Sequence, residues 1–375
     1  MTYTPIVIVG AGPAGIAAAV SLRDRSLNSV IVDRADQVAT SWRGRYEKLK
    51  LNTSKYFSHL PRRRYPPGTP MFPTRSEVAD YFERHARQSG IALQLSTNVM
   101  RIDPEPNGWR LATSSGDMRA NHVVVATGFE NTPHIPEWPG MGGFTGELLH
   151  SSAYHNPAPY EGKRILVVGS GSSGMEIAHD LAAGGADRVW LAVRTPPNIL
   201  TRAGPGGIPG DLMAIALYHA PVGVGDAIAR FVQRRTIGDL TEFGLPMPDE
   251  GLFTRARRNL APTILDMDVI TAVRDRSVHV VKTIDSFDHN TVSLVDGTRL
   301  QPDAVICATG YLRGLEALVG HLDVLNDDGI PRVLAPMPAA RGLWFTGFLA
   351  RPALIGYIAK QSRPLAKQIA AVADG

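Results

Sequence analysis

The sequence predicts an α/β fold made of two doubly wound units, with the second unit inserted into the first, and three observations support this. An apolar strand, a G-x-G-x-x-G turn and an apolar-faced helix follow one another near the start of the chain and again in residues 164–194. Two further apolar strands, in 120–130 and 302–312, each close in A-T-G, so that similar strand ends stand before and after the second unit. The glycines concerned are Gly10, Gly12 and Gly15 in the first copy and Gly169, Gly171 and Gly174 in the second. We therefore expect two Rossmann-like dinucleotide-binding domains.

The first glycine pattern has a physical explanation at every position. Gly10 permits a tight turn, Gly12 lets the backbone approach a pyrophosphate, and Gly15 lets helix and strand pack closely. The start of the helix offers unpaired N–H groups to the phosphates. Asp33 ends the following strand, where its carboxylate can accept hydrogen bonds from ribose hydroxyls. The alternative is a tight turn that binds no ligand. It is the weaker interpretation, because a strand precedes the glycines, a helix follows them and an acidic residue stands at the expected position.

The second copy differs from the first at the end of its second strand. Arg194 and Thr195 stand where the first copy has Asp33. A guanidinium there suits a 2′-phosphate, which a carboxylate would repel. This favours NADPH over NADH, although a solvated arginine at a strand end remains an alternative.

Two dinucleotide units in one chain indicate an electron relay in which one nucleotide delivers a hydride and the other receives it. We expect FAD at the first site and NADPH at the second. The predicted arrangement is a FAD-binding domain in residues 1–157, an NADP-binding domain in 158–310, and a return to the FAD-binding domain in 311–375.

Composition limits the function classes. A chain of 375 residues, 44% of them hydrophobic and 20% charged, fits two globular domains. The net charge of +4 gives no reason to expect nucleic acid as a partner. No apolar run approaches membrane-spanning length, and the opening "MTYTPIVIVG" enters a strand at once, so we expect a cytoplasmic protein without a membrane span. The basic run "LPRRRYPP" at 60–67 is interpreted as a solvated loop, with a phosphate-binding or membrane-surface patch as the alternative.

The single cysteine, Cys307, excludes an internal disulfide and a catalytic cysteine pair. It lies in an apolar run, so we expect a buried packing residue. A helix is predicted for 75–88 and short strands for 91–125. Apolar helical segments are predicted for 211–235 and interpreted as core or cavity wall, with a membrane anchor as the alternative.

The stretch "FTGELLHSSAY" at 144–154 carries an F-x-G-x-x-x-H-x-x-x-Y spacing between the two glycine patterns. With those patterns, it resembles the flavin-containing monooxygenases, class B enzymes that hold FAD and NADPH on one chain. The segments "YEKLKLNTSKYFSHLP", "FPTRSEVADYFERHA", "TIGDLTEFGL", "PTILD" and "CATGY" are similar to the YUCCA-type branch and its bacterial relatives. Plant members of that branch decarboxylate indole-3-pyruvate oxidatively.

The resemblance implies roles for particular residues. Asn52 matches an asparagine beside the flavin ring, the one catalytic residue expected; a turn-forming asparagine is the alternative, and plant YUCCA proteins carry histidine there. Trp42 matches a tryptophan packed near the isoalloxazine, and the backbone amides of 350–361 face the flavin's anionic edge. Further cofactor contacts are expected from Ala11, Pro13, Ala14, Arg34, Gln37, Ser41, Val99, Thr127, Gly128, Ser172 and Ser173.

The motif at 144–154 is expected in the linker between the two domains. Gly146 would let the linker turn, and His150 and Tyr154, four residues apart, would share one helical face and tie the linker to a domain, with Phe144 completing the motif. His150 as a general base is the sharper alternative, but no carboxylate is apparent to support it.

The resemblance implies that NADPH reduces FAD, that reduced FAD forms a C4a-(hydro)peroxyflavin with O2, and that one oxygen atom enters a soft nitrogen or sulfur nucleophile or an α-keto acid. No metal is expected. A Baeyer–Villiger monooxygenase is one alternative. It is disfavoured because that group's version of the motif ends in Trp followed by Pro or Asp, whereas here the motif ends in Tyr154 followed by His155. A FAD-binding NADPH oxidase or sensor is another. The substrate and the oligomeric state stay open, with a homodimer as a candidate.

Overall fold

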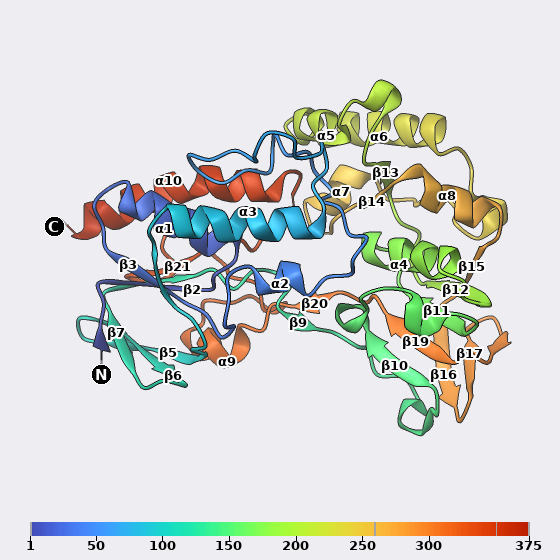
Figure 1. The fold of residues 1–375 in the computed structure, drawn as a ribbon, viewed down its shortest axis with the longest axis horizontal. Helices are drawn as coiled ribbons and strands as arrows, with labels where there is room; N and C mark the ends of the chain where they lie inside the picture. Colours follow the sequence, from blue (N-terminus) through green and yellow to red (C-terminus); the bar gives the residue numbers. More distant parts are fainter. Residues whose placement is uncertain (1, 259, 350, 374–375) are drawn as a thin grey trace.

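The computed structural model describes residues 2–258, 260–349 and 351–373, and two parallel five-stranded sheets organise this part of the chain (Figure 1). Ala350, at the start of the segment 350–361, lies outside the described residues. The first sheet has the order β21 (Leu343–Phe345), β8 (His122–Val125), β2 (Ile6–Val9), β3 (Ser29–Val32) and β4 (Ala92–Gln94). The second has the order β10 (Glu147–His150), β19 (Ala304–Cys307), β11 (Arg164–Val168), β12 (Arg188–Val193) and β15 (Val278–Lys282).

The second sheet is inserted between two neighbouring strands of the first. β8 and β21 pair in parallel, yet every strand of the second sheet lies between them in the sequence. The two crossing segments meet as β9 (Thr132–Pro133) and β20 (Tyr311–Leu312), which pair antiparallel. A mixed α/β fold with parallel sheets, as predicted, is therefore present. The second sheet starts before residue 158, the predicted start of the second domain. Its edge strand β10 covers Glu147–His150, where Leu148 and Leu149 pair with β19.

Helices cover one face of each sheet, as Figure 1 shows. α1 (Pro13–Arg23), α3 (Arg75–Gln88) and α10 (Leu354–Ala373) lie over the first sheet, and the Ser21 and Ser362 hydroxyls join α1 to α10 at 2.8 Å. Thr74, the residue before α3, caps the start of this helix and forms a capping box with Glu77. α4 (Ser172–Ala183) and α8 (Met267–Arg274) lie over the second sheet. The predicted helix at 75–88 is confirmed.

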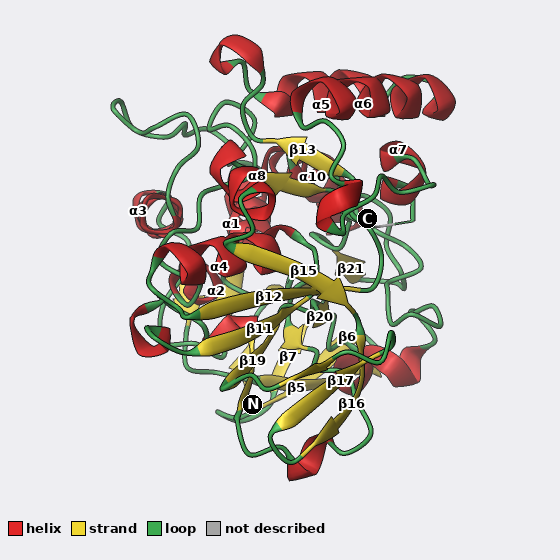
Figure 2. Cartoon of the chain, turned by 90° about the vertical axis from the view of Figure 1, so that its right-hand side faces the viewer, coloured by secondary structure: helices red, strands yellow, loops and turns green. Residues whose placement is uncertain are grey.

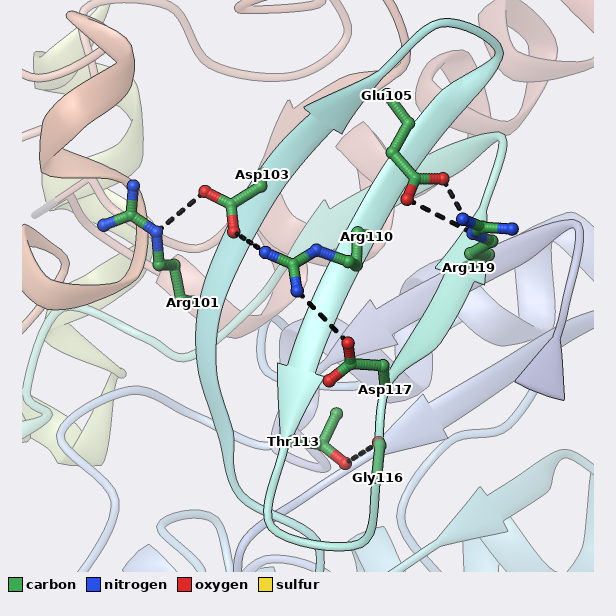
Figure 3. Close-up of polar contacts among 8 residues, drawn as sticks. All are labelled: Arg101, Asp103, Glu105, Arg110, Thr113, Gly116, Asp117 and Arg119. Carbon is green, nitrogen blue, oxygen red and sulfur yellow. Dashed lines mark hydrogen bonds and ion pairs between the residues drawn. The ribbon is translucent and has the colours of Figure 1, made fainter. Parts of the chain in front are cut away.

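A mixed sheet of β1 (Thr2–Tyr3), β7 (Met118–Ala120), β6 (Gly108–Thr113) and β5 (Val99–Glu105) covers the other face of the first sheet. Its inner side chains, including Ile102 and Leu111, are fully buried. Figure 3 shows its outer face, where Arg110 reaches both Asp103 and Asp117, at 2.9 and 3.2 Å, and Arg119 reaches Glu105 at 2.8 Å. These exposed pairs add little stability, so we assign this face a solvated structural role.

The remaining elements are short. The predicted strands in 91–125 and helices in 211–235 are confirmed. Strands β13 (Ile199–Thr201) and β14 (Thr263–Leu265) pair in parallel, and β16 (Ile284–Asp288), β17 (Thr291–Leu294) and β18 (Arg299–Leu300) form an antiparallel sheet. The other α-helices are α2 (Thr40–Arg43), α5 (Gly210–Tyr218), α6 (Val222–Thr236), α7 (Leu252–Ala256) and α9 (Glu316–Val319). Short 3-10 turns are Met141–Gly143, Ser151–Ala153, Ala158–Tyr160, Pro205–Gly207, Thr241–Phe243 and Gly320–Leu322.

Two sequence expectations can be checked on the fold alone. Cys307 lies in β19 with no exposed surface, and burial raises the pKa of its thiol to about 12, so it is a packing residue as predicted. Among the described residues, no helix combines the length and the apolarity needed to cross a membrane.

Candidate functional site

The first glycine turn is fixed by two close backbone contacts and left open at one position. Gly10 has φ +116°, and a Cβ there would lie 2.6 Å from the carbonyl oxygen of Ala126. A Cβ on Gly15 would lie 1.9 Å from the carbonyl oxygen of Gly10. A Cβ on Gly12 would meet nothing within 4 Å. Packing therefore requires Gly10 and Gly15, whereas Gly12 faces space into which a ligand can approach.

The second turn repeats this geometry. Gly169 has φ +114°, a Cβ on it would lie 2.5 Å from the carbonyl oxygen of Ala308, and a Cβ on Gly174 would lie 1.9 Å from that of Gly169. A Cβ on Gly171 meets open space. Ala126 and Ala308 are the first residues of the two A-T-G segments. Each A-T-G segment thus lies against the first glycine of one turn, which explains why the two motifs recur together.

A single cavity of about 1000 Å³ joins the first turn to the start of α4. Of the residues predicted to bind cofactors, its lining includes Gly10, Ala11, Gly12, Pro13, Ala14, Asp33, Arg34, Ser41, Trp42, Asn52, Val99, Thr127, Gly128, Ser172 and Ser173. The other predicted residues lie outside the lining: Gly15, Gln37, Gly169, Gly171, Gly174, Arg194 and Thr195. Residues 351–355, before and at the start of α10, also line it.

The end of the cavity at the first turn carries polar groups suited to a dinucleotide. The carboxylate of Asp33 accepts hydrogen bonds from the backbone N–H groups of Ala11, at 2.6 Å, and Ala35, at 2.8 Å. The hydroxyl of Thr127 is buried and has no hydrogen-bond partner among the described residues, although it lines the cavity. A buried hydroxyl without a partner is costly, so the open cradle at Gly12 and this hydroxyl fit a bound nucleotide.

The second turn is more exposed. Arg194 and Thr195 lie at the surface directly after β12, as Asp33 lies directly after β3. The carbonyl of Thr195 accepts a hydrogen bond from the Ser170 hydroxyl at 3.1 Å, which holds the strand end against the turn. The backbone after Arg194 is therefore held near the turn, and Arg194 itself is exposed to solvent.

Asn52 contacts a buried arginine that the sequence did not single out. Nη2 of Arg202 donates a hydrogen bond to Oδ1 of Asn52 at 3.1 Å, and both residues line the cavity. Arg202 is 2% exposed and follows β13. Because its oxygen accepts from Arg202, the amide of Asn52 is oriented with its NH2 group as the remaining donor.

Arg202 belongs to a cluster that joins residues of the first unit to residues of the second. It forms ion pairs with Glu176 of α4 at 2.5 Å and with Asp266, the residue before α8, at 2.6 Å. Glu176 also accepts from the Tyr46 hydroxyl, and Asp266 pairs with Lys50 at 3.3 Å. Two cations and two carboxylates leave the cluster neutral. Lys50 and Asp266 are partly exposed, so the buried charges are those of Arg202 and Glu176, which offset each other.

Burial and these charges set the protonation of the cluster. Burial raises the pKa of Glu176, although Arg202 opposes the shift. Burial works in the same direction on Asp266, but Arg202 and Lys50 outweigh it and hold the pKa of that carboxyl below its usual range. Burial, followed by the Glu176 carboxylate, raises the pKa of Tyr46 well above its ordinary value. Tyr46 therefore stays a neutral donor.

The expectation of a helical linker at His150 and Tyr154 is wrong. Glu147–His150 is strand β10 and Ser151–Ala153 a single 3-10 turn, because Leu148 and Leu149 complete the edge of the second sheet. The two side chains do tie elements together. The Nδ1 of His150 accepts from the Ser152 N–H at 3.1 Å, so its Nε2–H donates to the Gly310 carbonyl at 2.9 Å. Both ring nitrogens are engaged, and burial lowers the pKa of His150.

Tyr154 is fully buried and donates to Asp180 of α4 at 2.7 Å, and Lys48 pairs with the other oxygen of that carboxylate at 2.7 Å. The Phe144 ring packs against Phe287 at 5.3 Å between centroids, and a Cβ on Gly146 would lie 2.5 Å from the Phe144 ring. The motif at 144–154 therefore anchors the second sheet to the crossing strands and to residues 45–50, a structural role.

The described residues contain no group of three or more His, Cys, Asp or Glu side chains placed to hold a metal ion. Trp42 lines the cavity with its ring packed edge-on against Phe82, 6.0 Å between centroids.

Comparisons with known proteins agree with this geometry. The profile described as pyridine nucleotide-disulphide oxidoreductase matches residues 7–199. The probable indole-3-pyruvate monooxygenase YUCCA9 of Arabidopsis thaliana is 33% identical over 91% of this chain and 83% of its own length. The indole-3-pyruvate monooxygenase YUCCA1 of Oryza sativa subsp. japonica is 31% identical over 93% of this chain and 88% of its own length. The structure of a flavin-containing monooxygenase from Stenotrophomonas maltophilia has the same fold, with a TM-score of 0.77, 23% identity and full coverage of both chains.

Proposed function

Because the chain belongs to the flavin monooxygenase family that includes the indole-3-pyruvate monooxygenases, we propose that its 1000 Å³ cavity brings FAD, the nicotinamide end of NADPH and the substrate together. The protein is a flavin-dependent monooxygenase that uses FAD and NADPH, and these two predictions from the sequence are confirmed. The shared profile with disulphide oxidoreductases reflects the common fold, since one buried cysteine cannot form a catalytic pair.

The observation that carries the proposal is that residues of both turns border one cavity. Gly12 and Thr127 line it from the first unit, and Ser172 and Ser173 line it from the start of α4 in the second. FAD would lie along the first turn with its ribose at Asp33, and NADPH along the second turn with its 2′-phosphate at Arg194. The unit that holds β2 and β21 is then the FAD-binding domain, and the unit inserted within it is the NADP-binding domain.

FAD, when bound, supplies the redox chemistry between NADPH and O2. The chain's own residues bind, orient and exclude water. Arg202 fixes the Asn52 amide so that its NH2 group is the donor available to the cavity. A preorganised neutral donor stabilises negative charge that develops beside it. Backbone N–H groups at the start of α10 lie in the same lining and add the positive end of a helix dipole.

Apolar side chains form much of the wall on the side of the second unit. Leu200, Leu252 and Ile264 line the cavity there, and Leu354, Ile355 and Ile358 line it from α10. An apolar wall excludes water from the reacting groups and favours a substrate with an apolar body. The names of the plant relatives, which specify an α-keto acid, support an α-keto acid substrate, and a soft nitrogen or sulfur nucleophile is the other class that the chemistry accepts.

A substrate panel tests the proposal. Oxygen and NADPH consumption by FAD-loaded enzyme would be measured with aromatic α-keto acids, with tertiary amines and sulfides, and with cyclic ketones, and products identified by mass spectrometry. We expect stoichiometric product from the first or second group. Product from ketones alone would instead favour a Baeyer–Villiger enzyme. If NADPH is consumed but only hydrogen peroxide is formed with every group of compounds, an oxidase is favoured. If no NADPH is consumed, a sensor is favoured.

A further inference from the structure

Helices α5 and α6 carry an apolar surface that faces solvent. They lie at the outer edge of the molecule, away from both sheets (Figures 1 and 2). Leu212 is 52% exposed, Val224 51% and Phe231 61%. Ile208, Met213 and Ile228 are also exposed. These six side chains define the α5–α6 face. Single exposed apolar residues need no explanation, but six within 24 consecutive positions do.

The pattern along α6 shows that this exposure is systematic. Its buried positions are Gly225, Ala229 and Gln233, one helical stripe. Its exposed positions are Gly223, Val224, Ala227, Ile228, Phe231, Arg234 and Arg235. A surface helix normally places polar residues on its outer side, whereas here the outer side is apolar and ends in two arginines.

Acidic side chains are missing from the outer side of both helices within the part of the chain that the structure describes. Asp211 of α5 is buried and accepts from the N–H and the hydroxyl of Ser54. Asp226 of α6 accepts from the Phe253 N–H at 2.6 Å and from the Thr254 hydroxyl at 2.5 Å. Both carboxylates therefore serve internal contacts, and the surface charge of the two helices is positive.

A cation packs against an aromatic ring of this face. The Arg235 guanidinium sits 5.5 Å from the Phe231 ring centre. The loop 52–73 is held to α5 through Ser54 and Asp211 and exposes Tyr56. The arginines at 62–64 of this loop lie elsewhere, because Arg62 pairs with Asp24 after α1 at 2.7 Å and Arg63 donates to the Gln88 carbonyl at the end of α3. Apolar and aromatic side chains edged by arginines are the composition of helices that lie in a membrane interface.

We propose that the α5–α6 face is a docking surface for an anionic lipid membrane. At 15 residues, α6 is about 22 Å long, shorter than the hydrocarbon core, so the helices lie in the interface plane. Arg234 and Arg235 face the lipid phosphates. The inner side of α5, at Gly210, Asp211 and Ala214, lines the cavity. The cavity wall is therefore one helix thick at the membrane, which suits a lipophilic substrate. Residues 211–235 were expected to form core or cavity wall in preference to a membrane anchor; α5 does line the cavity, whereas the outer side of both helices is exposed.

Vesicle co-sedimentation of the FAD-loaded protein tests the proposal. Vesicles of phosphatidylcholine alone and of phosphatidylcholine with phosphatidylglycerol would be compared. We expect strong partition onto the anionic vesicles, weakened by salt. The Ile228→Ser/Phe231→Ser variant should lose roughly tenfold or more in partition, because two large apolar side chains leave the lipid. Arg234→Glu/Arg235→Glu should abolish the preference for anionic lipid.

The matched control is Val295→Ser/Met337→Ser, which removes two side chains of similar exposure, 57% and 58%, outside α5, α6 and the loop 52–73. It should bind vesicles as the unchanged protein does. Retained FAD absorbance shows that each variant is folded. Equal partition of the Ile228/Phe231 variant and the unchanged protein, or no binding by the unchanged protein, would overturn the proposal. So would a homodimer in sedimentation velocity that the Ile228/Phe231 variant dissociates, since a second copy would then cover the face.

Discussion

Arg202 and Asn52, 150 positions apart in the sequence, are joined by a hydrogen bond of 3.1 Å at the wall of the cavity. Asn52 comes from the loop after α2, and Arg202 follows β13 in the second unit. The contact therefore forms only when the two units are correctly docked. It couples the orientation of a candidate catalytic amide to the docking of the unit proposed to hold NADPH.

Asn52→Asp should uncouple NADPH oxidation from product formation. The carboxylate keeps the size of the side chain and the contact with Arg202 but cannot donate. Losing one preorganised donor costs on the order of 3 kcal/mol, or about a hundredfold in oxygen transfer. FAD binding and NADPH oxidation should persist, with hydrogen peroxide released in place of product. The ratio of peroxide to NADPH consumed is the measurement.

Asn52→Ala is the companion variant and should behave alike, because it also lacks the donor. If Asn52→Asp forms product as well as the unchanged enzyme does while Asn52→Ala does not, the donor role is wrong and the residue only fills space or forms a turn.

Gly12→Ala and Gly171→Ala should separate the two nucleotide sites. Each new Cβ enters open space in the protein alone, so both variants should fold, and their thermal stability should match that of the unchanged protein when all are compared without nucleotide. Gly12→Ala should lose FAD, and Gly171→Ala should keep FAD but need a much higher NADPH concentration. FAD absorbance after gel filtration and the KM for NADPH are the readouts. Gly142→Ala, another position with open space, is the control. FAD retained by Gly12→Ala would contradict the assignment of the first site.

Arg194→Ala should weaken the binding of NADPH and leave the binding of NADH almost unaffected. A charge-assisted hydrogen bond to phosphate contributes about 1.5 to 3 kcal/mol, or roughly one to two powers of ten in affinity. The KM values for both nucleotides measure the effect. Equal losses for NADPH and NADH would show that Arg194 does not read the 2′-phosphate.

Stability should fall as the pH falls below about 6.5. Burial lowers the pKa of His85, His122 and His150 below the ordinary value of 6.5. The unfolded chain then binds more protons than the folded one, so stability is complete above pH 6.5 and is lost toward the folded-state pKa values. Urea unfolding at pH 7.5 and 5.5 tests this. His122→Phe should reduce the difference, since the Nδ1 of His122 has no hydrogen-bond partner within the described ranges. A pH-independent midpoint would contradict the prediction.

Local signals in the sequence predicted the glycine turns. Gly10, Gly15, Gly169 and Gly174 each lie so close to a backbone carbonyl that a side chain would not fit. The same signals predicted α3 through its cap and its apolar spacing. The strand at Glu147–His150 was missed, because its pairing partner β19 lies far along the chain.

The Arg202 cluster was missed for a related reason. Tyr46, Glu176, Arg202 and Asp266 come from four separate segments, and no spacing in the sequence links them. Arg202 stands in the Pro/Gly-rich segment 194–210, where an arginine ordinarily indicates a solvated loop. The α5–α6 face was missed because apolar helical segments ordinarily indicate burial, and only the fold shows which side is covered.

The measurement that tests the central claim most directly is the fate of oxygen during turnover with ¹⁸O2. FAD-loaded enzyme, NADPH and a substrate accepted in the panel would be mixed under ¹⁸O2, and product and water analysed by mass spectrometry. A flavin monooxygenase places one labelled atom in the organic products and one in water for each NADPH consumed. Organic products without label, with all of the labelled oxygen recovered as hydrogen peroxide, would contradict the account.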